Sequence, residues 1–145
     1  MRIAVGADHG GFRLKDQLAA WLVTAGHGVT DVGVHDGSSV DYPDVAREAV
    51  GLLTAGEVDR VLLVCGTGQG MAMSANKIPG VRAAVVADVF SAKMASAHND
   101  AKVLCVGERV LGVGLALECV AAWLATEFEG GRHARRIDKL ESTPA

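Results

Sequence analysis

Cysteines are few in this chain, and no two of them stand at redox spacing. Cys65, Cys105 and Cys119 form an odd set without a C-x-x-C motif, which argues against a disulfide framework and for a reducing compartment. No segment reaches the roughly 20 consecutive apolar residues that cross a bilayer. The opening MRIAVGADHGG is interrupted too soon by Asp8 and His9 to resemble a signal peptide. We therefore predict a cytoplasmic protein with no membrane partner.

Strong charge of either sign is also missing. The formal net charge is −3, which gives no field that would attract nucleic acid, so any anion must be bound by a local group of positive side chains. The 145 residues are 50% hydrophobic and contain no low-complexity tract. This is enough for one substantial core and too little for two. We expect a single domain over residues 1–145 that ends in a basic arm at about 130–145.

Short β-branched runs alternate with amphipathic segments along the chain. The strand candidates are residues 2–8, 27–33, 59–66, 81–88 and 103–109. Helical spacing of apolar residues follows the first two of them, and a long helix at about 112–128 stops before the glycines at 130 and 131. Five βα units predict a doubly wound, Rossmann-like α/β fold, a three-layer α/β/α sandwich around a five-stranded parallel sheet.

The segment CGTGQGMAMSANK at 65–77 contains three alternating glycines. Position 71 is Met, so the segment is not G-x-G-x-x-G, and the chain has no G-x-x-x-x-G-K-[ST]. Both facts argue against a dinucleotide or triphosphate site. A tight turn that enters a helix still leaves backbone N–H groups and the positive end of the helix dipole free for an anion or a developing oxyanion.

Cys65 stands at the start of that turn. In parallel sheets, ligands bind beyond the carboxyl ends of the strands, where Asp8, His9 and Cys65 are expected. A thiol beside a helix N-terminus can act as a base or nucleophile at neutral pH, because the dipole stabilises the thiolate. The alternative is a small buried hydrophobe that ends a core strand. We assign that structural role to Cys105 and Cys119, which lie inside apolar segments.

Two further groups have the residue types of an anion site. His98 stands in S-A-H-N-D, at the expected end of a helix that begins near Val89. Arg132 and Arg136 are four apart, so they share one face of a helical arm and suit a bidentate grip on phosphate. A dipole-stabilised histidine and a solvated basic end are the corresponding structural alternatives.

Six motifs in order and spacing resemble the ribose-5-phosphate isomerase B family, which includes galactose-6-phosphate and allose-6-phosphate isomerases. They are GADHGGFRLKD, DVGVHDGSSVDYPD, CGTGQGMAMSANK, the H-N-D at 98–100, GERVLG and EGGRHARR, and they span nearly all of residues 1–140. The resemblance implies a doubly wound aldose–ketose isomerase that works without a cofactor or metal, as a homodimer or dimer of dimers. Its expected substrates are ribose 5-phosphate and ribulose 5-phosphate.

The resemblance also assigns catalytic roles by motif. Cys65 matches the base that moves a proton between the first two sugar carbons. Thr67 matches the stabiliser of the enediolate, and Asp8 with His98 matches the pair that opens the furanose ring. One branch of the family lacks the cysteine and uses a glutamate where this chain has Met71, so this chain follows the cysteine branch.

The remaining matched positions would bind the sugar phosphate. The enediolate cradle is expected from the backbone at Gly66, Gly68, Gly70 and Met71, with Ser74 on the following helix. The resemblance places Asn99 and Tyr42 beside the sugar, and assigns the phosphate to His9, Arg109, Arg132 and Arg136.

Helix direction predicts that each site is shared between two chains. The helix that ends at His98 leaves the carboxyl edge of the sheet and runs back, and nine residues carry His98 roughly 13 Å toward the opposite edge. His98 should therefore not reach its own Cys65. A partner chain related by a two-fold axis would supply it.

Other functions remain open at this point. Within the family, the substrate could be allose 6-phosphate, galactose 6-phosphate or a tetrulose phosphate, and the chain could be one subunit of a heteromeric galactose-6-phosphate isomerase. Outside the family, a nucleotide-binding or receiver-like module would share the sheet and its acidic strand ends. A thiol redox protein fits poorly, because no second cysteine lies in the Cys65 loop.

Overall fold

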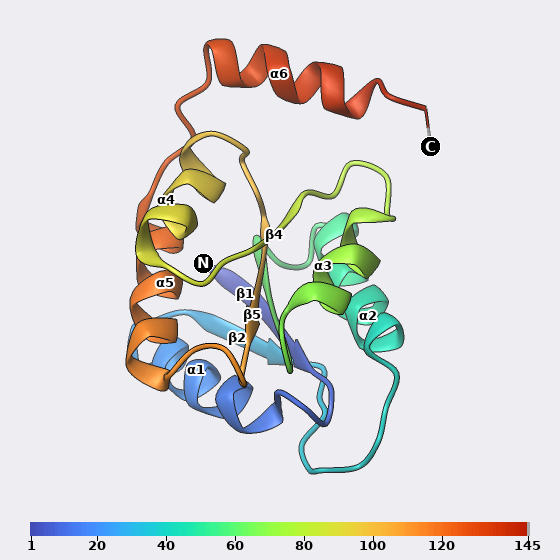
Figure 1. Cartoon of the computed structure of the whole chain (residues 1–145), viewed down its shortest axis with the longest axis vertical. Helices are drawn as coiled ribbons and strands as arrows, with labels where there is room; N and C mark the ends of the chain where they lie inside the picture. Colours follow the sequence, from blue (N-terminus) through green and yellow to red (C-terminus); the bar gives the residue numbers. More distant parts are fainter. Residues whose placement is uncertain (145) are drawn as a thin grey trace.

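The computed structural model describes residues 1–144, so Ala145, the last residue of the predicted basic arm, lies outside the described residues. Five strands alternate with helices along the chain (Figure 1). The strands are β1 (Arg2–Ala7), β2 (Gly28–Asp31), β3 (Arg60–Cys65), β4 (Ala83–Val85) and β5 (Val103–Gly107). The helices are α1 (Phe12–Thr24), α2 (Tyr42–Thr54), α3 (Gln69–Asn76), α4 (Val89–Ala97), α5 (Val113–Ala125) and α6 (Arg132–Glu141).

The strands form one parallel sheet in the order β2-β1-β3-β5-β4. Figure 1 shows α1, α4 and α5 on one face and α2 with α3 on the other. Right-handed crossovers explain this division, because the chain steps from β1 to β2 in one direction and from β2 over β1 to β3 in the other. The predicted doubly wound three-layer sandwich is confirmed. Its topological switch point lies between the carboxyl ends of β1 and β3.

Alternate residues of each central strand enter opposite cores. In β3, Leu62 and Val64 pack with α1, α4 and α5, whereas Leu63 and Cys65 pack with α2 and α3. Strands buried on both faces need continuous apolar sequence, and five of the six β3 residues are buried. On β3, the core between the sheet and helices α2 and α3 therefore ends at Cys65, the residue that precedes the glycine loop.

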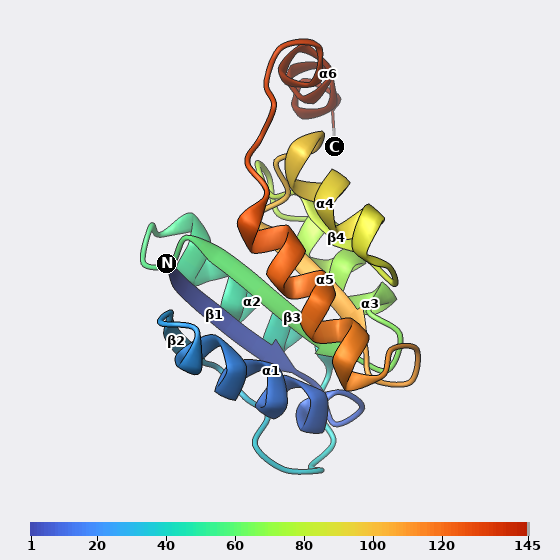
Figure 2. The ribbon, with the colours of Figure 1, turned by 90° about the vertical axis from the view of Figure 1, so that its left-hand side faces the viewer.

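The last two helices differ from the expected boundaries. The helix expected to reach residue 128 ends at Ala125, because Thr126 has extended backbone angles. The basic arm forms α6, which lies beyond the amino-terminal edge of the sheet (Figures 1 and 2). Its one buried side chain is His133, and no α6 residue belongs to either core. Within residues 1–144, no helix is long and apolar enough to cross a membrane.

A buried cation ties α1 to the end of β2. The Lys15 side chain is fully buried, and its Nζ lies 2.6 Å from Asp31 Oδ2 and 2.9 Å from Asp16 Oδ1. Asp31 also accepts from the backbone N–H of Gly33 at 2.8 Å, which positions the start of the loop that leads to α2. A buried ammonium is tolerated only when it is paired. Asp31 therefore joins the buried ammonium to the start of this loop.

Asp31→Asn should lower the free energy of unfolding by about 1.5–3 kcal/mol, because the buried ammonium loses its nearer anion while the Gly33 hydrogen bond is kept. Asp44→Asn is the matched control, since it breaks an exposed pair with Arg47 that contributes less than about 1 kcal/mol. Urea unfolding at neutral pH measures both. Equal losses in the two variants would contradict a special role for the buried pair.

Candidate active site

The carboxyl ends of β1 and β3 bring the first group of predicted residues together. Asp8 is 8% exposed, and its Oδ1 accepts from Gly10 N at 2.8 Å, which closes the turn after β1. That turn touches the β3 loop, because a Cβ added at Gly10 would lie 3.3 Å from Gly66 N. His9 Nδ1 accepts from the backbone N–H of Val40 at 3.4 Å. Asp8, His9 and the loop after Cys65 are thus neighbours at the switch point.

The thiol of Cys65 is 5% exposed and carries one hydrogen bond. Its Sγ accepts from Gly68 N at 3.0 Å. Gly68 is the N-cap of α3 with a φ of 81°, a left-handed conformation that glycine adopts without strain. The turn therefore directs a backbone N–H at the sulfur, which fixes the sulfur at the start of the loop. Burial raises the pKa of Cys105 well above its usual range, which fits its predicted structural role.

Three close approaches place other predicted residues around the loop. A Cβ added at Gly70 would lie 2.7 Å from the Tyr42 ring, and one added at Gly66 would lie 3.5 Å from the Arg109 side chain. A Cβ added at Gly107 would lie 2.7 Å from the backbone of Thr67. The approaches at Gly70 and Gly107 are too close for a Cβ, whereas the distance at Gly66 is an ordinary van der Waals contact. Tyr42 and Arg109 therefore lie beside the glycine loop, and Thr67, within the loop, lies against the end of β5.

Two predicted residues of α3 have their side chains engaged elsewhere. Met71 is fully buried in the core with α2, so only its backbone remains to face a ligand. The Ser74 hydroxyl donates to Gly70 O at 2.8 Å. The prediction for Met71 concerned its N–H group and is compatible with this burial.

The second group of predicted residues gathers where α4 ends against α6. His98 is the C-cap of α4, and its ring stacks on that of His133 with centroids 4.1 Å apart. His98, Asn99 and Arg136 line a cavity of about 240 Å³ with His133, Ile137 and Leu140. Arg132, the first residue of α6, is exposed. Two of the three predicted phosphate arginines, Arg132 and Arg136, thus lie on the helix that packs against the predicted ring-opening histidine.

His133 was not predicted as a site residue. Burial lowers its pKa, and His98 and the nearby arginines lower it further. The sequence offers one signal for it, a histidine between two arginines at the start of a helix. Its stacking on His98 joins segments 35 residues apart and has no local signature.

The two groups lie at opposite edges of the sheet. In both views, α6 and the end of α4 are at the top, whereas the strands point to the bottom (Figures 1 and 2). Cys65, Asp8 and Tyr42 therefore belong to one edge, and His98 and Arg136 to the other. Within one chain the structure does not assemble all the predicted residues into a single pocket.

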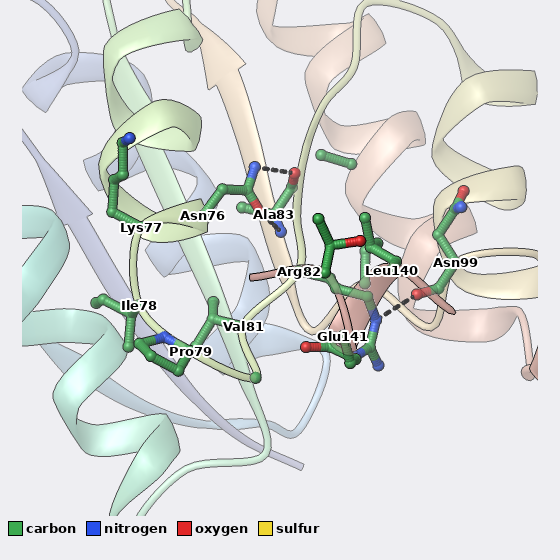
Figure 3. Close-up of a pocket in the computed structure, with 14 residues that line it drawn as sticks. Asn76, Lys77, Ile78, Pro79, Val81, Arg82, Ala83, Asn99, Leu140 and Glu141 are labelled. Carbon is green, nitrogen blue, oxygen red and sulfur yellow. Dashed lines mark hydrogen bonds and ion pairs between the residues drawn. The ribbon is translucent and has the colours of Figure 1, made fainter. Parts of the chain in front are cut away.

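A larger cavity of about 580 Å³ lies between the α3–β4 connection and α6 (Figure 3). Asn76 and Ala83 exchange two hydrogen bonds at its wall, at 2.9 and 2.8 Å. Arg82 donates to the Asn99 carbonyl at 2.8 Å and pairs with Glu141 at 2.6 Å. Of the predicted residues, this cavity contains only Asn99, so we do not assign the reaction to it.

Comparisons with known proteins identify the family of the chain. The family model for ribose/galactose isomerases matches residues 3–140. This chain belongs to the ribose/galactose isomerase family. Its membership confirms the predicted resemblance and excludes the receiver-like and thiol redox alternatives. The chain is accordingly an isomerase.

Individual members of the family cover nearly the whole chain. The ribose-5-phosphate isomerase B of Escherichia coli (strain K12) is 43% identical, over 96% of this chain and 93% of that protein. The D-erythrulose-4-phosphate isomerase of Pectobacterium atrosepticum is 41% identical, over 97% and 93%. The solved structure of Clostridium thermocellum ribose-5-phosphate isomerase B superposes with a TM-score of 0.96 at 48% identity, over 97% and 95%.

Gly107→Ala should lower isomerase kcat/KM by about 100-fold, because the methyl group must displace Thr67 and a misplacement near 1 Å at a reacting centre has that effect. The matched control is Gly114→Ala on α5, where a new Cβ meets nothing within 4 Å. That variant should keep full activity. Steady-state kinetics on both proteins measures the effect, and wild-type activity of Gly107→Ala would show that the approach is not critical.

Proposed function

We propose that the chain interconverts ribose 5-phosphate and ribulose 5-phosphate through an enediolate, with Cys65 as the base. Its family and relatives make it a sugar phosphate isomerase. The observation that carries the finer proposal is the Sγ of Cys65, held 3.0 Å from Gly68 N at the mouth of the glycine loop. A base must lie within reach of the proton that it takes, and this position puts the sulfur beside the backbone N–H groups that would bind the enediolate oxygens.

The proton transfer needs few groups. The Cys65 thiolate takes the proton from C2 of the open-chain aldose, the C1–C2 enediolate forms, the hydroxyl proton moves from O2 to O1, and the thiol returns its proton to C1. Electrons move only within the sugar, so the step consumes no cofactor. Backbone N–H groups from Gly66 to Met71, with the Thr67 hydroxyl, stabilise the enediolate oxygens, and each such donor contributes about 3 kcal/mol. The positive end of α3 adds to this field.

Ring opening and phosphate binding use both edges of the sheet. We assign ring opening to Asp8 with His98, and place Tyr42 and Asn99 beside the sugar. The phosphate ligands are His9, Arg109, Arg132 and Arg136. Because one chain separates these groups, a second copy must complete each site, in a homodimer or a dimer of dimers. The phosphate takes no part in the chemistry, but its binding holds the reacting carbon at the thiol.

A tetrulose phosphate is the second candidate substrate, because one relative at 41% identity is named as a D-erythrulose-4-phosphate isomerase. It is shorter than ribose 5-phosphate by one carbon. Allose 6-phosphate and galactose 6-phosphate are longer by one. We further propose a cytoplasmic location, since the three thiols are free and buried in the described chain.

The substrate is tested by a panel of sugar phosphates offered to the purified protein. We expect the highest kcat/KM with ribose 5-phosphate, because the relatives at 43% and 48% identity are named as ribose-5-phosphate isomerases B. The panel contains D-erythrulose 4-phosphate, allose 6-phosphate and galactose 6-phosphate. A higher kcat/KM with any of these would replace our choice of substrate.

Mixed oligomers test the shared site. Cys65→Ala and His98→Asn homomers should each be nearly inactive, and about a quarter of wild-type activity should return when equal amounts are unfolded and refolded together. Random pairing makes about half the dimers mixed, each with one intact site and one site that carries both changes. Each variant refolded alone is the control. No recovery despite mixed dimers seen by mass spectrometry would place Cys65 and His98 in the same chain's site.

A further inference from the structure

Three donor groups converge where α4 ends against α6. His98, Glu129 and His133 each offer one nitrogen or oxygen atom, and these atoms all lie within 4.8 Å of one another. His133 Nε2 is 3.5 Å from Glu129 Oε2. Among residues 1–144, this Nε2 is one of two buried side-chain nitrogens without a hydrogen-bond partner. A buried, unpartnered imidazole nitrogen that faces a carboxylate has an unused lone pair or proton.

The backbone holds the three donors in a fixed frame. Glu129 N donates to Ala97 O at 3.0 Å, which attaches the connection after α5 to the last turn of α4. The glycines at 130 and 131 both have positive φ, 65° and 56°, and turn the chain into α6. His133 N donates to Gly130 O at 3.0 Å. These contacts place His133 next to Glu129 and hold both residues beside His98.

We propose that His98, Glu129 and His133 bind a divalent transition metal of the zinc type, and that the bound metal inhibits isomerisation by occupying the His98 imidazole. The second half rests on the proposed role of His98 in ring opening. The first half rests on the donors alone. The bound metal acts as an inhibitor, and isomerisation itself proceeds without it.

The donor set matches the chemistry of zinc. Two imidazoles and one carboxylate form a common zinc ligand set with metal–ligand distances near 2.0–2.2 Å, and they leave a fourth position for water or an anion. Nitrogen-rich sites favour Cu²⁺ and Zn²⁺ over Mn²⁺ and Mg²⁺. The donors must approach one another to reach bonding distance. The Glu129 side chain is 56% exposed and His98 is half-buried, so both have room to move toward the fixed His133.

The surrounding charges affect the affinity of the site for a metal ion. Arg136 lines the same cavity as the two histidines and opposes a cation there. Glu129 is the one acidic ligand and offsets part of this repulsion. Removing its charge should therefore weaken binding more than loss of one neutral ligand would. A phosphate group held by the arginines could take the open position on the metal.

Zinc titration of the metal-free full-length protein, by isothermal calorimetry, tests the binding. We expect one Zn²⁺ per chain in the wild type, and affinity lower by at least about tenfold in Glu129→Gln. Glu127→Gln is the matched control, because Glu127 is also exposed on the same connection and belongs to no donor group. His133→Asn removes a neutral ligand, so it should also weaken binding, but less than Glu129→Gln does. Equal affinity in all four proteins, or no binding to the wild type, would overturn the site.

Inhibition is measured separately with the same proteins. Zn²⁺ should inhibit the wild type and Glu127→Gln, EDTA should restore both, and Glu129→Gln should keep basal activity and need at least about tenfold more Zn²⁺ for the same inhibition. If Zn²⁺ inhibited Glu129→Gln as strongly as the wild type, the Cys65 thiol would be its target. That result would overturn inhibition through His98. Glu129-dependent binding without inhibition would overturn it too. If the protein turned over none of the sugar phosphates, calorimetry would still decide the metal site.

Discussion

Backbone contact between the β3–α3 loop and its neighbours is the constraint on which the rest of the candidate site depends. Gly107 meets Thr67 at a distance that excludes a side chain, and Gly10 lies in a tight contact with Gly66. These contacts fix the loop against the ends of β1 and β5. With the loop fixed, the N–H of Gly68 stays directed at the Cys65 sulfur. A preorganised donor does not have to reorient as charge develops, and for this reason it is effective in catalysis.

The separation of the site into two groups follows from the winding of the chain. Each helix after a strand returns toward the amino edge, so a residue at the end of α4 lies far from the strand ends. In this protein α6 then brings its arginines to the same far corner (Figure 2). Under our proposal, a chain built in this way would bind a phosphorylated sugar only with a second copy. The oligomer would therefore be part of the catalytic design.

His98 has two possible partners under our proposals. In one state its imidazole serves the sugar ring at a partner's thiol. In the other it joins His133 and Glu129 around a metal ion. The stacked arrangement, with ring planes 10° apart, keeps the His98 ring beside His133. Competition between these states would make the isomerase rate depend on the metal concentration. The effect would come from occupancy of the His98 imidazole by the metal, without a change of fold.

The sequence by itself determined the alternation of strands and helices, the doubly wound class, and the place of Cys65 at a strand end before a glycine turn. These features depend on local periodicity, on turn chemistry, and on motif order that resembles a known family. Only the tertiary structure decided that β5 inserts between β3 and β4, that His133 stacks on His98, and that Glu129 completes a donor group. Strand order and such contacts depend on packing between segments far apart in the chain. Local sequence patterns do not encode that packing.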